Sequence, residues 1–284
     1  MAVRILTDST CDIPLEQAKA LGITIVPLIV FFGDEAFLDG IELDNASFYS
    51  KLQTSKVSPR TSQPPPAAFE EAYKRLINEG VDGILSVHVS SKLSGTYQSA
   101  CSGWEALPDE LKKIPIELVD SSIVSLGLGI PVMRAAKEAE RGLSLPELKA
   151  RLLDRLARMK IFFVLDTLEY LKRGGRIGGA RALLGNILSV KPILSFKNGE
   201  IVPIEQPRTR SKAYARIAQL VGELGVVEEM AVIESDEEVG QQLAQSLKTV
   251  YQGEIPRYKL GAVLGAYAGP GTAGVMVITA SKDS

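Results

Sequence analysis

Short apolar runs alternate with segments of helical periodicity through the first half of the chain. Apolar runs bounded by turn residues predict buried strands, and apolar residues every three to four positions predict helices. The predicted strands are residues 3–6, 23–32, 36–38, 83–89 and 116–119. The predicted helices are residues 12–22, 45–52, 67–77, 97–107, 127–141 and 144–159. Strands separated by helices in this way predict an α/β domain with a mostly parallel sheet flanked by helices.

The second half has a different pattern. The predicted strands are residues 161–165, 192–196, 201–204, 230–234 and 274–279, and the predicted helices are residues 180–188, 209–224 and 236–251. Asn198-Gly199, between two of these strands, is a strong hairpin signal. The pattern predicts a smaller α+β domain with a largely antiparallel sheet. We place the boundary near Arg158, which gives domains of residues 1–158 and 159–284, and we predict no regular structure for the Ser-, Thr- and Pro-rich residues 54–66.

Composition excludes several classes of protein. The chain has 284 residues, is 45% hydrophobic and 23% charged, and carries a net charge of -2, which is ordinary for a globular protein and gives no sign of a nucleic-acid surface. The longest apolar run, residues 23–32, contains Thr24 and Pro27 and is half a membrane span at best. Cys11 and Cys101 are too few for a zinc motif or a disulfide framework. With no signal-peptide pattern at the N-terminus, we expect a cytoplasmic protein with no integral membrane segment and no metal site.

The chain has a single histidine, His88. A His-rich zinc site is therefore excluded, and a Ser-His-Asp triad could use only this residue. Because His88 lies within the apolar strand predicted for residues 83–89, we interpret it as a hydrogen-bonded core residue.

Three predicted strands of the first half end in polar turns, at residues 7–10, 90–96 and 120–122. Ligands of parallel α/β sheets bind outside the carboxyl ends of the strands, so these turns predict a sheet edge lined with donors for a polar head group. Ser94 precedes a helix, where backbone N–H groups suit a carboxylate or phosphate. From this turn alone, a simple helix-capping role for Ser94 is the plainer interpretation.

Two glycine- and arginine-rich stretches need separate treatment. Residues 269–274 match G-x-G-x-x-G, but no helix is predicted after them and Pro270 removes one N–H group, so we reject a dinucleotide site. The second stretch, from Arg173 to Arg181, is either a solvated helix face or a basic patch that binds an anionic partner or phosphate, and both interpretations stay open. Its arginines are Arg173, Arg176 and Arg181, with Arg208 and Arg210 further along the chain.

Six motifs together resemble the DegV family of proteins. They occur in the family's order and cover almost the whole chain: Thr7-Asp-Ser-Thr10, Thr61-Ser-Gln-Pro64, residues 90–100, Val119-Asp-Ser121, residues 168–177 and Gly269-Pro-Gly271. The family is similar to the fatty-acid-binding subunits that present a lipid to a separate fatty acid kinase. The resemblance implies an α/β domain beside a smaller α+β domain, with the acyl chain buried between the two. It also implies a binding subunit that needs no cofactor and is not itself an enzyme.

The resemblance also implies a set of site residues. Thr61 and Ser94 would hold the fatty carboxylate, supported by Ser62, Gly95 and Thr96. Tyr267 stands where family members commonly have a histidine, and a phenol donates a hydrogen bond but is not cationic at neutral pH. Arg173, Arg176, Arg208 and Arg210 are the candidates for contact with the partner or with phosphate.

Physical chemistry favours a lipid ligand. A tail of roughly 15 methylenes contributes on the order of 12 kcal/mol gross, whereas a hydrogen bond to a charged group contributes about 1.5–3 kcal/mol. The tail would supply affinity and the hydroxyl groups orientation. We further expect no arginine at the carboxylate, because a tight ion pair would blunt a group that must later be phosphorylated. No coiled coil or large interface is indicated, so we expect a monomer.

Two alternatives stay open. A serine hydrolase or acyltransferase using Ser94 lacks G-x-S-x-G and has only His88 as an imidazole base. A dihydroxyacetone-kinase-like sugar-binding domain shares the fold by resemblance, but such kinases bind substrate through a histidine, and His88 lies in an apolar strand.

Overall fold

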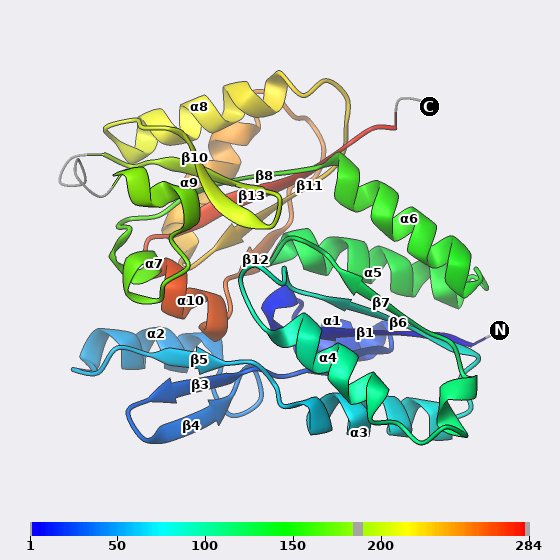
Figure 1. The fold of residues 1–284 in the computed structure, drawn as a ribbon. Coiled ribbons are helices and arrows are strands. Elements are labelled where there is room, and N and C mark those ends of the chain that lie inside the picture. Colours follow the sequence, from blue (N-terminus) through cyan, green and yellow to red (C-terminus); the bar gives the residue numbers. More distant parts are fainter. Residues whose placement is uncertain (1, 184–189, 282–284) are drawn as a thin grey trace.

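The computed structural model describes residues 2–183 and 190–281 (Figure 1). Its first half contains a four-stranded, all-parallel sheet with the strand order β2-β1-β6-β7. These strands are β1 (Val3–Asp8), β2 (Ile23–Val26), β6 (Gly83–His88) and β7 (Ile116–Asp120). Every residue of β6 is buried, as expected for a central strand covered on both faces.

Helices cover both faces of this sheet. On one face, α3 (Pro66–Asn78) and α4 (Thr96–Glu105) pack with Leu6 and Ile84. On the other face, α1 (Leu15–Ala20), α5 (Leu126–Glu140) and α6 (Leu145–Arg158) pack with Ile5 and Leu85. The predicted parallel α/β architecture is therefore confirmed. Short 3-10 turns are η1 (Ser9–Cys11) and η2 (Leu111–Lys113).

A small antiparallel sheet, β4-β3-β5, corrects two predictions. Its strands are β3 (Ile29–Phe32), β4 (Glu35–Leu38) and β5 (Arg60–Ser62), next to α2 (Asn45–Thr54). The single strand predicted for residues 23–32 is wrong, because the chain leaves the parallel sheet at Pro27, which lacks an N–H group, and enters the small sheet at Ile29. Residues 54–66 were also not wholly irregular, because the edge of β3 pairs with Arg60–Ser62.

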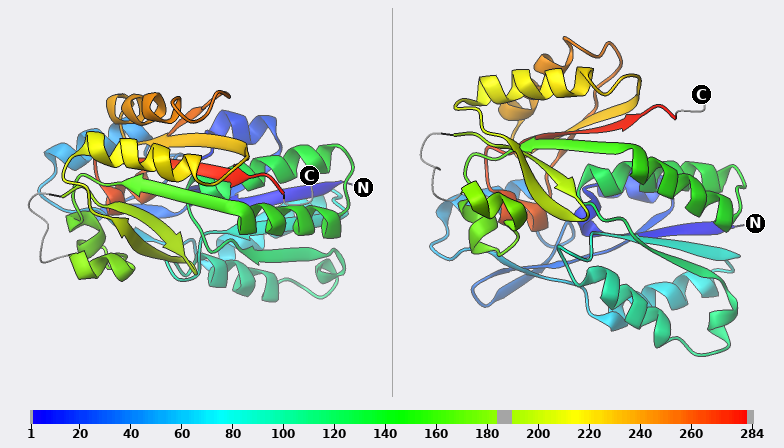
Figure 2. Two further views of the ribbon diagram at one scale, coloured as in Figure 1. Left: turned by 90° about the horizontal axis from the view of Figure 1, so that it is seen from above. Right: turned by 45° about the horizontal axis from the view of Figure 1, so that its top comes forward.

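The second half forms a six-stranded sheet with the order β10-β9-β8-β13-β11-β12 (Figure 2). Its strands are β8 (Met159–Val164), β9 (Ile193–Lys197), β10 (Glu200–Glu205), β11 (Val227–Glu234), β12 (Arg257–Lys259) and β13 (Ala273–Thr279). Only the β11–β12 pair is parallel, so the largely antiparallel sheet is confirmed. The predicted hairpin is present, with Asn198 and Gly199 at φ values of 52° and 83°. The helices α8 (Arg210–Gly222) and α9 (Glu237–Leu247) cover its outer face.

Among the described residues of the second half there are three shorter helical segments: α7 (Glu169–Arg173), η3 (Gly178–Leu183) and α10 (Ala262–Ala268). The helix predicted for residues 180–188 begins as the 3-10 segment η3, and its remainder, 184–188, lies outside the described residues. Neither α10 nor β12 was predicted, because glycines at 261, 265 and 269 mask the helical pattern. Gly265 allows close packing, since an added Cβ would lie 2.5 Å from Phe48 of α2.

The boundary near Arg158 stays a prediction. Each sheet is formed entirely on one side of it. The largest apolar cluster nevertheless joins the two halves, with Leu126 and Leu148 from one side and Ile161 and Ile233 from the other. Within residues 2–183 and 190–281, no helix is long and apolar enough to cross a membrane.

Candidate functional site

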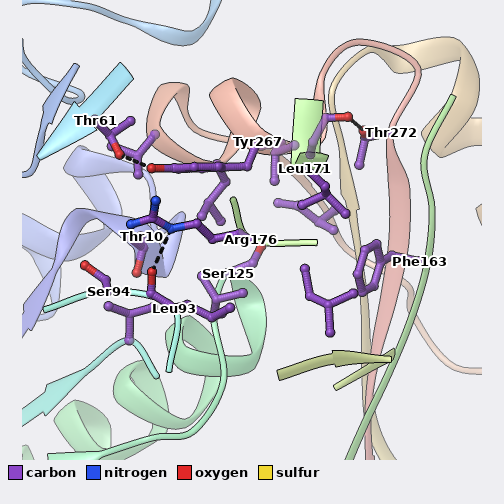
Figure 3. A pocket seen from close by; sticks show the side chains of 18 of the residues that line it. Thr10, Thr61, Leu93, Ser94, Ser125, Phe163, Leu171, Arg176, Tyr267 and Thr272 are labelled. Carbon is purple, nitrogen blue, oxygen red and sulfur yellow. Dashed lines mark hydrogen bonds between the residues drawn. The ribbon is translucent and has the colours of Figure 1, made fainter. Parts of the chain in front are cut away.

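A cavity of about 140 Å³ lies between the loop edge of the parallel sheet and the inner face of the six-stranded sheet (Figure 3). One water needs about 10–15 Å³ of such space, so the cavity has room on the order of ten waters. Its apolar lining residues are Leu28, Val89, Leu93, Val124, Ile161, Phe163, Leu165, Leu171, Phe196, Ile201, Ile233, Leu260, Val263, Leu264 and Ala268. Its polar lining residues are Thr10, Thr61, Gln63, Ser94, Ser125, Arg176, Tyr267 and Thr272.

Strand alternation builds the wall from the second half of the chain. In β8, Ile161 and Phe163 face the cavity, while Phe162 and Val164 pack under α8 and α9. Phe163 stacks on Phe196 of β9, with ring centroids 5.4 Å apart. Because successive strand residues point to opposite faces, one strand serves both the cavity and the outer core.

Loops after parallel strands build the opposite wall. Thr10 follows β1, Ser94 follows β6 and Ser125 follows β7, so three carboxyl ends meet at the cavity as predicted. After β7, the residue that lines the cavity is Ser125 and not one of the predicted residues 120–122. Residues 120–122 do not line the cavity, because Asp120 instead accepts hydrogen bonds from the backbone of Ser91 and Ser122.

Thr61 and Ser94, the two residues expected at the carboxylate, line the same cavity. The hydroxyl groups of Thr61 in β5 and Tyr267 in α10 lie 2.5 Å apart, although 206 positions separate them in sequence (Figure 3). Ser94 Oγ lies 2.8 Å from Thr96 Oγ1 and accepts the Thr96 N–H at 3.3 Å. The N-cap position of α4 is Gly95, so Ser94 forms a local turn before the helix while facing the cavity.

The expectation of a head-group region without arginine is wrong, because Arg176 lines the cavity. Its guanidinium lies 5.1 Å from the centre of the Tyr267 ring, donates from Nε to the Leu93 carbonyl at 3.1 Å and donates from Nη1 to the Gly174 carbonyl at 2.8 Å. The turn at Gly174 and Gly175 (φ 72°) redirects the chain after α7, and the Tyr267 ring occupies the space where a Cβ of residue 174 would lie. No described carboxylate forms a salt bridge with Arg176.

The expected supporting residues lie just outside the cavity lining. Ser62 is exposed and donates to the Gln63 carbonyl at 3.2 Å, while Thr96 is fully buried. Gly95 lies beneath Gln63, whose side chain would be 2.6 Å from an added Cβ. Gln63 itself lines the cavity and was missed, although it belongs to the Thr61-Ser-Gln-Pro64 motif.

The other arginines have separate surroundings. Arg173 donates to Ser58 Oγ at 2.5 Å and lies 3.5 Å from Glu169. Arg210 donates to Asp166 at 2.7 Å. Burial would raise the pKa of Asp166, but Lys191 and Arg210, which share this one carboxylate, hold it below its usual value. The exposed side chains of Arg181 and Arg208 do not line the cavity, so a shared basic patch stays a prediction.

His88 is a core residue. Its side chain is fully buried, with Nε2 2.7 Å from Ser86 Oγ and Nδ1 3.1 Å from Asp8 Oδ2. Phe69 packs against its ring edge to face. Both ring nitrogens therefore have partners other than Ser94, and the geometry provides no nucleophile–base pair of the kind a serine hydrolase needs. The described residues also contain no cluster of His, Cys, Asp or Glu able to hold a metal ion.

Fold and cavity together define an α/β protein with a mainly apolar cavity between a parallel and an antiparallel sheet, and with the hydroxyl groups of Thr10, Thr61, Ser94 and Tyr267 at one end. A family model described as "Uncharacterised protein, DegV family" matches residues 2–280. The chain belongs to the DegV family.

Relatives and solved structures that are similar to this chain are DegV proteins as well. A DegV domain-containing protein of Streptomyces coelicolor is 38% identical over 280 residues, covering 97% of this chain and 98% of its own. The structure described as fatty acid binding of a DegV family protein from Thermus thermophilus has a TM-score of 0.89 and 34% identity, and the match covers 99% of this chain and 100% of that one. The structure of DegV from Bacillus subtilis, described as a fatty acid binding protein, has a TM-score of 0.87 and 34% identity, with coverage of 98% and 100%.

Proposed function

We propose that this protein binds a long-chain fatty acid in the cavity and carries out no chemistry on it. The observation that carries the proposal is a mainly apolar cavity with the hydroxyl groups of Thr10, Thr61, Ser94 and Tyr267 at one end, which matches a ligand with an alkyl tail and a single polar head. The fatty acid binding named for the Thermus and Bacillus relatives supports the same ligand class.

The two ends of the ligand have different energetic roles. Burial of roughly 15 methylenes contributes on the order of 12 kcal/mol gross, so contacts with the apolar lining supply most of the affinity. A hydrogen bond to a carboxylate contributes about 1.5–3 kcal/mol, which is enough to fix the direction of the tail and to discriminate between head groups.

The head-group end has hydroxyl hydrogens that hydrogen bonds within the protein do not use. Thr61 and Tyr267 share one hydrogen bond, which uses one of their two hydroxyl hydrogens and leaves the other for a carboxylate. Ser94 and Thr96 likewise share one hydrogen bond between their hydroxyl groups, which uses one of their two hydroxyl hydrogens and leaves the other to donate. Arg176, with its charge unpaired by any described carboxylate, adds positive potential beside Tyr267, where the family resemblance implies a histidine.

We further propose that the carboxylate is presented to a separate fatty acid kinase. Arg176 is exposed and lines the cavity beside Tyr267, where a phosphate donor would carry negative charge. We propose that the protein acts as a monomer without a cofactor.

The test is to purify the protein, denature it and identify the released small molecules by mass spectrometry. A long-chain fatty acid near equimolar amount is the expected result, and addition of a fatty acid kinase with ATP should yield acyl phosphate. A purified protein that carries no acyl chain and takes none up would contradict the proposal. Labelling by a fluorophosphonate probe that is lost in Ser94→Ala would instead establish a serine nucleophile.

A further inference from the structure

Helix α10 belongs to the second half of the chain but packs largely against the first half. It contacts α2, β3, β5 and η1 of the first half as well as α7 of its own half, and it supplies Val263, Leu264, Tyr267 and Ala268 to the cavity lining (Figure 1). The position of this one helix therefore decides whether the Tyr267 hydroxyl reaches Thr61.

The start of α10 has no cap of its own. Its N-cap residue is Gly261, which has no side chain to accept the free N–H groups of the first turn. Asp12, only 8% exposed, accepts the Gly261 N–H through Oδ1 at 2.9 Å and the Ser125 hydroxyl through Oδ2 at 2.6 Å. An added Cβ at residue 261 would lie 2.7 Å from Asp12 Oδ1, so only glycine allows this approach.

Asp39 takes the next N–H groups. It is 5% exposed, and its carboxyl group accepts hydrogen bonds from the backbone of Ala262 and Val263 and from the Ser9 side chain. Two carboxyl groups from the first half thus replace the missing cap of a helix from the second half.

We propose that Asp12 and Asp39 are positioning residues for the fatty-acid site: they hold α10 in place so that the hydroxyl groups of Tyr267 and Thr61 lie together at the head group. This role rests on the proposed function. The contact between Tyr267 and Thr61 depends closely on the position of α10 along its axis. One residue of helical rise is about 1.5 Å, and a shift of that size would separate the two hydroxyl groups, which lie 2.5 Å apart.

The experiment compares binding of a long-chain fatty acid with binding of the alcohol of the same chain length. Asp39→Ala should reduce the preference for the acid by about tenfold, the scale of one hydrogen bond to a charged group. Alcohol binding should weaken less than acid binding, because only the contacts of the tail with Val263, Leu264 and Ala268 of α10 change. Asp39→Asn keeps an oxygen for the α10 N–H groups and should restore the preference. In a Tyr267→Phe background, Asp39→Ala should cause no further loss of preference.

Asp44→Ala is the matched control. Asp44 also caps a helix, accepting the Ser47 N–H at 2.7 Å, but that helix is α2, which does not line the cavity. Its loss should lower thermal stability without changing the acid-to-alcohol preference. If Asp39→Ala does not fold, Gly261→Ala provides a second way to displace the start of α10.

Three outcomes overturn the role: equal loss of acid and alcohol binding in Asp39→Ala, no restoration by Asp39→Asn, or a loss that adds fully to that of Tyr267→Phe. A wild-type protein that binds the alcohol as tightly as the acid also overturns it. A wild-type protein that binds neither ligand overturns the proposed function, and this role with it.

Discussion

The two walls of the cavity are built in opposite ways. The first half presents the loop edge of a sheet that is covered on both faces, so its contribution comes from Thr10, Ser94 and Ser125 just after the strands. The second half presents a sheet face, where Ile161 and Phe163 alternate with residues of the outer core. A parallel sheet buried on both faces can offer ligands little but its edge, whereas an antiparallel sheet can give a whole face to an apolar ligand. This difference divides the site into a part that orients the head group and a part that holds the tail.

The largest effects are expected from substitutions on the two opposite faces of β8. Phe162→Ala removes a side chain from the core under α8 and α9 and should lower the free energy of unfolding by about 3–5 kcal/mol, with fatty-acid affinity retained. Phe163→Ala, one residue further on, should weaken fatty-acid binding by about 10- to 100-fold, because the tail loses an aromatic contact. Chemical denaturation and ligand titration of both variants check this pair. Equal losses of binding in the two variants would contradict the assignment of faces.

Removal of the ligand should lower stability next most strongly. Because the tail would fill the space between two lobes, protein stripped of lipid should gain about 2.7 kcal/mol when a fatty acid is added at one hundred times its dissociation constant. Thermal unfolding with and without added fatty acid measures this gain. The alcohol of the same length should give most of the gain, since it shares the tail.

The polar wall should show smaller and selective effects. Thr61→Val and Ser94→Ala should each weaken fatty-acid binding by about 1.5–3 kcal/mol while leaving binding of the matched alcohol much less changed. Thr61→Val and Tyr267→Phe should not be additive, because the two hydroxyl groups share a hydrogen bond. Isothermal titration of the single and double variants checks both statements. Full additivity would show that the two residues act independently.

Per pH unit, the smallest expected effect is a pH dependence of stability. Burial raises the pKa of Asp12 to about 8, and burial raises that of Asp39 to about 6. A carboxyl with a raised pKa binds more protons folded than unfolded, so its contribution to stability is full below about pH 4 and is lost as pH rises through the folded pKa. Between pH 6 and 8, Asp12 should therefore lower stability by at most about 1.4 kcal/mol per pH unit.

Asp12→Asn should remove this slope, as measured by denaturation at several pH values. The groups that face Asp12 are the carboxyl groups of Asp39 and Asp8, which disfavour a further negative charge, and the neutral side chains of Cys11 and Tyr49. Arg257 and Lys259 lie across the neighbouring groove and are paired with Glu234. An unchanged slope in Asp12→Asn would assign the titration to another group.

Local patterns predicted most elements, and tertiary pairing accounts for the failures. The hairpin at Asn198-Gly199 and the loops bearing Thr10 and Ser94 follow from turn chemistry and the direction of parallel strands. The strand β5, which carries Thr61, could not be read locally, because its three residues are ordered by the edge of β3. Arg176 was placed by a glycine turn and the Tyr267 ring, which no spacing in the sequence reveals.

Native mass spectrometry of the intact protein tests the central claim most directly. We predict one long-chain fatty acid per polypeptide, retained under native conditions and released on denaturation. A polypeptide of bare mass that also gains no mass on incubation with fatty acids would contradict the account.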